Sequence, residues 1–176
     1  MDFQLTLDAI RRRAETLWPR RAVVSRNADG TLHRTTLGES LYRAGRLASA
    51  LRRLGIRPGD RVATLCWNHH RHFETYFVVP MLGAVLHTLN LRLHPDELGD
   101  IASHAGDRAI IVDRSLLPLL ESFRQRTVIG HVIVISDDGA TPGGTLDYES
   151  LLAAEGDAST DVAEPNERDA ASMGYT

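Results

Sequence analysis

The feature that most constrains this chain is residues 55–92, which hold two short apolar runs separated by a helix-like segment. The runs are residues 61–67 and 84–89, and their composition is typical of strands covered on both faces of a parallel sheet. Two such strands joined by a helix make a βαβ unit, whose crossover is right-handed in nearly all proteins. This stretch predicts an α/β domain.

Further strand and helix patterns alternate along the chain, which favours a parallel-rich sheet flanked by helices. Turn residues between two short polar-apolar runs predict an N-terminal hairpin. We expect hairpin strands at 21–26 and 31–36, sheet strands at 109–112 and 131–135, and helices over 5–18, 36–54, 68–82, 95–106, 115–123 and 147–154. Ligands of such sheets bind outside the carboxyl ends of the strands.

Local signals predict how several helices begin and end. Thr36 and Glu39 have the spacing of a capping box, and Gly55 has the position that favours a left-handed residue after a helix. We expect the helices near Asn68 and Ser115 to be capped by those side chains. In the first helix, Leu7, Ile10, Ala14 and Leu17 form an apolar stripe, and Arg11, Arg12 and Arg13 are expected on its outer side.

The chain divides into three parts in this interpretation. Residues 1–154 form the α/β subdomain, residues 155–170 an acidic connector, and residues 171–176 the start of another strand. The lone Cys66 lies in an apolar run and is expected to be a buried thiol. With no signal-peptide pattern and no apolar run long enough to span a bilayer, we expect a soluble, cytoplasmic protein.

Charge is distributed unevenly although the net charge is only −3. Residues 1–92 carry 15 Arg against 7 acids, and residues 93–176 carry 5 Arg against 16 acids. We favour complementary faces that meet within the fold or across a dimer over a basic surface that binds phosphate or anionic lipid. The balance predicts no nucleic-acid partner and at most a peripheral membrane contact.

His69, His70 and His72 are the densest group of polar side chains. Imidazoles bind zinc, but the His-x-x-x-His spacing of a helical zinc site is missing, so a polar helix start is the favoured interpretation. Because positive charge is unfavourable at a helix N-terminus, we expect these imidazoles to be neutral.

Asn90 and Arg92 follow the second buried run, where Arg92 could form a bidentate contact with a carboxylate or phosphate. A structural arginine, which holds nearby carbonyl oxygens or pairs with Asp96 or Glu97, is the favoured alternative. No Gly-x-Ser-x-Gly surrounds any serine, and no Gly-x-Gly-x-x-Gly follows a strand. The chain has no lysine, so a Walker-type phosphate loop is also excluded. From the residues alone we assign no catalytic residue.

The segments GDRVA at 59–63, GAVLHTLNLRL at 83–93 and HAGDRAIIVD at 104–113 resemble the N-terminal region of AMP-forming acyl-CoA synthetases, in particular the medium- and long-chain fatty acyl branch. The resemblance covers nearly the whole chain. In that family a strand ending in Tyr-Thr leads into a Ser/Thr/Gly-rich phosphate loop, and Gly174-Tyr175-Thr176 matches its first letters.

The resemblance implies a function and a fold. The fold is the N-terminal part of the adenylate-forming enzyme fold, and the parent enzyme would use a fatty acid, ATP, Mg2+ and CoA. Tyr175 and Thr176 are the implied cofactor-binding residues, and Thr176 is the implied metal contact. The remaining functional segments of the family match no residue here, so the 176 residues alone are expected to be inactive. Relatives of this branch dimerise through their N-terminal region, which implies a homodimer.

Two alternatives stay open at this point. One is a non-catalytic α/β dimerisation or interaction module, which would bind neither ATP nor an acyl adenylate. The other is a Rossmann-type oxidoreductase domain, which the missing glycine fingerprint disfavours.

Overall fold

The computed structural model describes residues 4–27, 29–156 and 166–175. The helices are α1 (Leu7–Leu17), α2 (Leu37–Arg53), α3 (His70–Met81), α4 (Pro95–Ala105), α5 (Leu117–Phe123) and α6 (Tyr148–Ala153), with 3-10 turns at Arg114–Leu116 and Arg124–Arg126. The strands are β1 (Ala22–Arg26), β2 (Leu32–Thr36), β3 (Arg61–Leu65), β4 (Val85–Thr88), β5 (Ala109–Asp113), β6 (His131–Ile135), β7 (Leu146–Asp147) and β8 (Ser172–Met173). The predicted α/β alternation is confirmed.

Six strands form one sheet in the order β7-β6-β5-β3-β4-β8, and every neighbouring pair is parallel. Strand β3 therefore lies between β4 and β5, and its Ala63 pairs with His87 on one side and Ile110 on the other. Because all strands run the same way, their carboxyl ends meet at one edge, where parallel sheets bind ligands.

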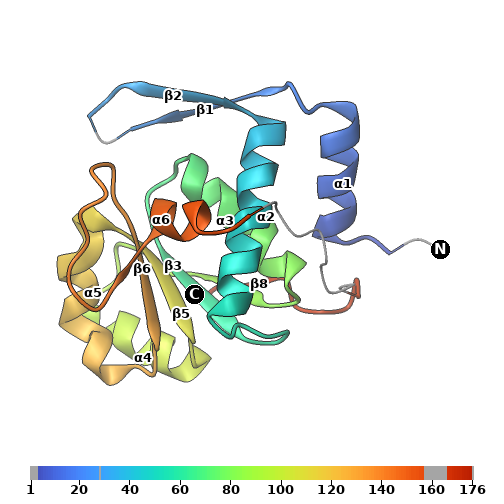
Figure 1. Cartoon of the computed structure of the whole chain (residues 1–176). Helices are drawn as coiled ribbons and strands as arrows, with labels where there is room; N and C mark the ends of the chain where they lie inside the picture. The colour runs from blue at the N-terminus through green and yellow to red at the C-terminus, as the bar shows by residue number, and fades with distance from the viewer. Residues whose placement is uncertain (1–3, 28, 157–165, 176) are drawn as a thin grey trace.

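Two hydrophobic cores cover the two faces of this sheet. On one face, α2, α3 and α6 pack against side chains such as Val62, Leu86 and Ile111. On the other face, α4 and α5 pack against alternate residues such as Ala63, Ile110 and Val112. The alternation follows from the two-residue period of a strand. The result is the three-layer arrangement in which helices flank the sheet (Figure 1).

The predicted hairpin is formed by β1 and β2, whose antiparallel register runs from Ala22 opposite Thr36 to Arg26 opposite Leu32. Figure 1 shows it at the top of the molecule, apart from the six-stranded sheet and leading into α2. Helix α2 begins with the predicted capping box of Thr36 and Glu39, and Gly55 after it has a φ of 89°. Both local predictions are confirmed.

Helix α1 differs from its sequence prediction in which face it buries. Thr6 caps it as expected. Arg11, however, was predicted to lie on the outer side and is buried, within 2.8 Å of Asp8 and 2.7 Å of Glu15. Ile10 and Leu17 of the apolar stripe remain 58% and 50% exposed. Asp8 and Arg11 are the residues that α1 buries, and the helix packs beside α2 and α3.

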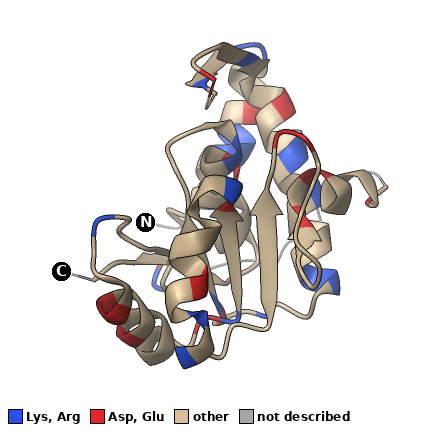
Figure 2. Ribbon diagram, turned by 90° about the vertical axis from the view of Figure 1, so that its left-hand side faces the viewer, with Lys and Arg blue, Asp and Glu red and all other residues tan. Residues whose placement is uncertain are grey.

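Arginines from the first half of the chain meet acids from the second half within the fold. Arg43 and Arg71 both bind Glu149, at 2.9 and 2.7 Å, and Arg71 also binds Asp137 at 2.8 Å. Figure 2 shows basic and acidic positions interspersed over the ribbon. These contacts support complementary faces over a free basic surface. Within the described residues, no helix is both long enough and apolar enough to cross a membrane.

The division of the chain into 1–154, 155–170 and 171–176 stays a prediction, because residues 157–165 lie outside the described part. Beyond them, Asn166–Asp169 forms a turn, and Ser172–Met173 joins the sheet beside β4 as the predicted new strand. Cys66 is a free, buried thiol, as expected.

Candidate functional site

The carboxyl edge of the sheet collects most polar side chains that the sequence singled out. Trp67 and His69 follow β3, Asn90 and Arg92 follow β4, and Tyr175 follows β8. Since these segments end parallel strands of one sheet, they lie at one edge. The candidate site is this edge, at the β4–β8 side.

Tyr175 is the predicted cofactor-binding residue that the structure describes. Its hydroxyl lies 2.6 Å from Nδ1 of His104 in α4, and its ring centroid lies 5.4 Å from that of His87 and 5.8 Å from that of His104. The side chain is therefore held by two imidazoles on the α4 side of the sheet. Thr176, predicted to contact phosphate and metal, lies outside the described residues, so that prediction is untested.

His87 and Asp107 form a buried pair that sequence reasoning missed. Nδ1 of His87 lies 2.9 Å from both carboxylate oxygens, and the side chains are 1% and 0% exposed. Burial raises the pKa of the Asp107 carboxyl, and the hydrogen bond from His87 opposes that rise. A histidine within the apolar run of residues 84–89 was the available signal, because a buried imidazole requires a partner.

A second histidine–carboxylate pair follows β3 and β5. Nε2 of His69 lies 2.9 Å from Asp113, whose other oxygen accepts the N–H of Trp67 at 2.6 Å. Nδ1 of His69 accepts the N–H of His72 at 3.3 Å, so His69 caps α3 and the predicted cap Asn68 was wrong. The longer imidazole reaches both the helix and Asp113.

Ser115 was also predicted to cap a helix, and this too was wrong. It lies in a 3-10 turn before α5, which begins without a side-chain cap. Its hydroxyl instead accepts a hydrogen bond from the indole N–H of Trp67 at 3.1 Å. The Ser115 hydroxyl, which we expected to cap the helix, therefore makes a tertiary contact with Trp67 instead.

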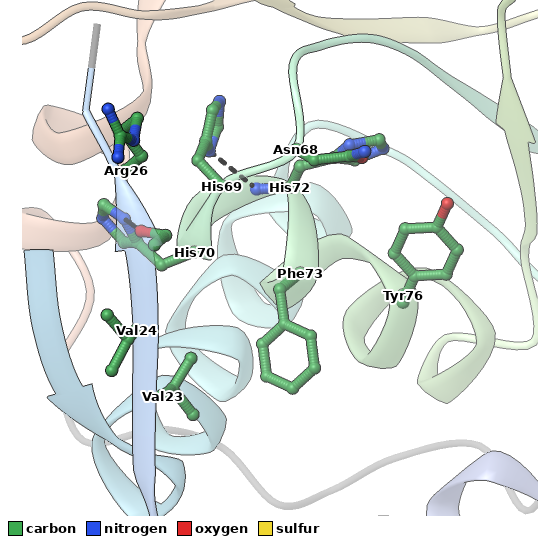
Figure 3. Close-up of a pocket in the computed structure, with 10 residues that line it drawn as sticks. Val23, Val24, Arg26, Asn68, His69, His70, His72, Phe73 and Tyr76 are labelled. Atoms are coloured by element: carbon green, nitrogen blue, oxygen red, sulfur yellow. Dashed lines mark hydrogen bonds between the residues drawn. The ribbon is translucent and has the colours of Figure 1, made fainter. Parts of the chain in front are cut away.

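A cavity of about 410 Å3 opens between the hairpin strand β1 and the start of α3 (Figure 3). One wall presents the imidazoles of His69, His70 and His72, and Phe73 and Tyr76 continue it along the helix. Val23, Val24 and Arg26 of β1 stand on the other side, and Ser25 also lines the cavity.

The imidazole of His70 is fixed by the hairpin. It stacks on His33 with a centroid separation of 3.7 Å, and its Nδ1 lies 3.1 Å from the Ser25 hydroxyl. Burial and the neighbouring positive groups, His33 first among them, lower the pKa of His70 to about 3. Burial also lowers the pKa of His72. These shifts support the predicted neutral imidazoles for both residues.

The described residues contain no group of three or more His, Cys, Asp or Glu side chains with the geometry of a metal site. The three histidines make separate contacts: His69 caps a helix, His70 packs on the hairpin, and Nε2 of His72 lies 3.1 Å from the hydroxyl of Thr64. The cap by His69 fits the polar helix start, whereas His70 and His72 make tertiary contacts with the hairpin and with β3.

Asn90 and Arg92 make a local turn, in which the Asn90 side chain accepts the N–H of Arg92 at 3.1 Å. The alternative in which Arg92 pairs with Asp96 or Glu97 was wrong. Asp96 binds Arg126 at 2.8 Å, and Glu97 accepts the N–H of His94 at 3.0 Å in a capping box. Both acids therefore serve other contacts, and Arg92 is exposed at the carboxyl edge.

Comparison with known proteins agrees with this geometry. The profile of the family described as AMP-binding enzyme matches residues 10–176. The chain belongs to this family of AMP-binding enzymes. A long-chain-fatty-acid–CoA ligase of Thermus thermophilus is 47% identical over the whole chain, and a medium-chain-fatty-acid–CoA ligase of Ectopseudomonas oleovorans is 32% identical over 98% of it.

The solved structures show the same fold at low sequence identity. An anthranilate CoA ligase in complex with anthranoyl-AMP superposes on the whole chain with a TM-score of 0.89 at 22% identity, using 33% of its own length. A fatty acyl CoA synthetase of Mycobacterium tuberculosis covers 97% of the chain with a TM-score of 0.81 at 24% identity, using 32% of its length. The chain spans about a third, 32%, of each ligase from Thermus and Ectopseudomonas.

Proposed function

We propose that this chain forms the N-terminal part of an AMP-forming fatty acyl-CoA synthetase, which converts a fatty acid, ATP and CoA to acyl-CoA, AMP and pyrophosphate. The observation that carries the proposal is the 47% identity, over the whole chain, with a long-chain-fatty-acid–CoA ligase. Because the chain spans 32% of that relative, the reaction is proposed for a polypeptide of the relative's full length.

In the proposed reaction, a fatty carboxylate oxygen attacks the α-phosphorus of ATP, and pyrophosphate leaves. The sulfur of CoA then attacks the acyl carbonyl of the adenylate, a carbon–sulfur bond forms, and AMP leaves with the electron pair of the broken carbon–oxygen bond. Catalysis of the first step rests on positioning and on neutralising phosphate charge. Mg2+ would supply part of that neutralisation when bound.

This chain's own contribution is to support and direct the phosphate-binding segment. Tyr175 stands at the carboxyl edge of a parallel sheet, where such folds bind ligands. Tyr175 therefore suits the proposed cofactor contact. The roles proposed for Thr176 toward phosphate and Mg2+ rest on the resemblance alone, and we derive no step through the metal.

The test is fatty-acid-dependent exchange of labelled pyrophosphate into ATP by the purified full-length polypeptide for which the reaction is proposed, with acids of increasing chain length. We expect exchange with medium- or long-chain acids and none with benzoate at the same concentration. Formation of the acyl-CoA, detected by mass spectrometry, identifies the second step. Exchange with no acid in the series, by a folded protein that binds ATP, would refute the proposal.

A homodimer through the N-terminal region is the proposed assembly. The supporting observation is the apolar side of α1, where Ile10, Leu17 and Trp18 are each at least 50% exposed. Apolar patches of this kind mark interfaces. Leu17→Glu should convert the dimer to a monomer in analytical ultracentrifugation, whereas Thr16→Glu on the same helix should not. A wild-type monomer at high protein concentration would contradict this assembly.

The non-catalytic interaction module remains the alternative function, and the same exposed face of α1 favours it. It predicts dimerisation without pyrophosphate exchange. A cytoplasmic location stays a prediction that rests on the buried thiol of Cys66.

A further inference from the structure

His87 and Asp107 form a buried hydrogen-bonded pair that spans one strand of the sheet. His87 lies in β4, Asp107 precedes β5, and β3 runs between these two strands. The residue of β3 in register with His87 is Ala63, whose small side chain leaves room for the contact. Nδ1 of His87 reaches both Asp107 oxygens at 2.9 Å.

Asp107 is itself fixed by the end of α4. Gly106 has a φ of 67°, and a Cβ there would lie 2.8 Å from Nη2 of Arg61. The Arg61 guanidinium donates to the carbonyl oxygens of Ala105 and Gly106 at 2.6 and 3.3 Å. A non-glycine residue would therefore be strained at position 106 and would collide with Arg61. This turn determines where the Asp107 carboxylate points.

A hydrogen bond from His87 to the Asp107 carboxylate places a proton on Nδ1, and in that tautomer of the imidazole Nε2 carries a lone pair. Nε2 is buried and has no hydrogen-bond partner among the residues that the structure describes. Leaving a polar atom buried and unpaired is costly, and an apolar pair of similar volume would avoid that cost. Stability alone does not account for a histidine here.

Tyr175 is the group that His87 contacts at the candidate site. Strand β8 is only two residues long and pairs with β4 through Ser172 and Met173, with Ala171 accepting the N–H of Leu86 at 3.0 Å. So short a ladder constrains weakly the direction in which the chain leaves it. The Tyr175 ring lies between two imidazoles, and its hydroxyl is 2.6 Å from His104.

We propose that His87, oriented by Asp107, and His104 are positioning residues that hold Tyr175 and thereby set the direction in which the chain leaves β8 toward ATP. The inference rests on the proposed function for the identity of the ligand. The geometric part, that the two histidines hold Tyr175, is independent of it and is tested separately.

The geometric part is tested by amide hydrogen exchange of residues 171–175 in the purified protein. Tyr175→Phe and His104→Phe should each speed exchange there about fivefold, the effect of one lost hydrogen bond. Because both variants remove the same bond, the double variant should exchange no faster than either single variant. His131→Asn, in β6, is the matched control and should leave these amides unchanged. Additive effects, or none, would overturn the positioning of Tyr175.

The second test separates positioning from stability. In the variant His87→Leu/Asp107→Leu, an apolar pair replaces the polar one, and the urea midpoint should stay the same or rise. If His87 positions Tyr175, the exchange of residues 171–175 should nevertheless quicken, and KM for ATP should rise about tenfold. KM for the fatty acid should stay within twofold. Unchanged exchange with a raised midpoint would show that the pair is only structural, and would overturn the proposal.

The two proposals can fail separately. If the wild-type protein forms no acyl adenylate with any fatty acid, the proposed function fails, and the exchange data still decide whether the histidines hold Tyr175. If the wild type is active and the leucine variant raises KM for ATP and for the fatty acid equally, the function stands and the positioning role toward ATP is refuted.

Discussion

Two histidine–carboxylate pairs lie on the same sheet, and they differ in whether both ring nitrogens of the histidine have a partner. Their carboxylates stand at opposite ends of β5, with Asp107 before the strand and Asp113 as its last residue. His69 uses both ring nitrogens, one to cap α3 and one to bind Asp113. His87 uses only Nδ1, and its Nε2 is buried without a partner in the described part of the chain.

The difference separates a structural histidine from a candidate functional one. Every contact of the His69 pair secures local structure: the first turn of α3, and the loop at Trp67, whose N–H binds Asp113 at 2.6 Å. The His87 pair secures no helix end or turn, and the contact it makes outward is with Tyr175. The comparison predicts that the two pairs respond differently to substitution.

The largest effect is expected from Asp107→Ala. This change leaves His87 buried in the sheet without its partner, and breaking a buried pair costs about 3 to 5 kcal/mol. Asp113→Ala should cost less, about 1.5 to 3 kcal/mol, because the side chains of His69 and Asp113 are 13% and 10% exposed, against 1% and 0% for His87 and Asp107. Urea unfolding followed by circular dichroism measures both free energies.

Asp100→Ala is the matched control for that comparison. Asp100 lies on α4 and forms an exposed ion pair with Arg126, with side chains 72% and 43% exposed. Its loss should cost under about 1 kcal/mol. An equal loss of stability in the Asp107 and Asp113 variants would show that the two pairs do not differ as described.

The second prediction uses acid. Since the pKa of His70 is about 3 in the folded protein and about 6.5 when unfolded, the unfolded chain binds more protons between those values. Stability should therefore fall as pH decreases from 6.5, by about 1.4 kcal/mol for each pH unit from this residue. Burial raises the pKa of Asp107, and this shift has the opposite effect on stability. As pH falls the folded chain takes up the proton first, so the contribution of Asp107 to stability increases.

His70→Gln removes the titrating ring and should flatten the stability profile between pH 6.5 and 4.5 relative to wild type. His131→Gln serves as the control, because His131 lies at the start of β6, away from the hairpin cavity. Parallel profiles for the His70 variant and wild type would mean that His70 is not the residue that acid charges.

Local rules predicted much of the fold because the signals lie within a few residues of one another. The capping box of Thr36 and Glu39 and the strand-helix-strand pattern of residues 55–92 are of this kind, and both are confirmed. The errors at Asn68, Ser115 and Arg11 share a cause: the partners that decide them, Asp113, Trp67 and the helices beside α1, are fixed only by tertiary structure.

The candidate site was predictable in part. Tyr175 followed from the resemblance of residues 174–176 to the start of a phosphate loop. Its neighbours did not, because His87 in β4 and Asp107 before β5 come from segments on the two sides of β3, and their contact depends on the strand order. That strand order arises from the crossover of α4 to the other face of the sheet, which no spacing in the sequence encodes.

The third prediction separates the two contacts of His69. His69→Ala removes the cap of α3 and should cost about 1 kcal/mol in unfolding free energy. His69→Asn keeps a good capping oxygen and should recover most of that loss, although the shorter side chain no longer reaches Asp113. Equal losses in the two variants, measured by urea unfolding, would mean that the contact with Asp113, and not the cap, is what His69 contributes.

The smallest effect is expected at Ser25, where β1 meets α3. Ser25→Ala removes the hydroxyl that lies 3.1 Å from Nδ1 of His70, a neutral hydrogen bond worth about 0.5 to 1.5 kcal/mol. Ser25→Thr keeps the hydroxyl and suits a strand, so it should preserve stability. Because His70 also stacks on His33, exchange of the hairpin amides should quicken in the alanine variant, and that of β4 should not. Faster exchange in β4 would show that the hairpin and the β4–β8 edge open together, which would contradict a local role for the Ser25–His70 contact.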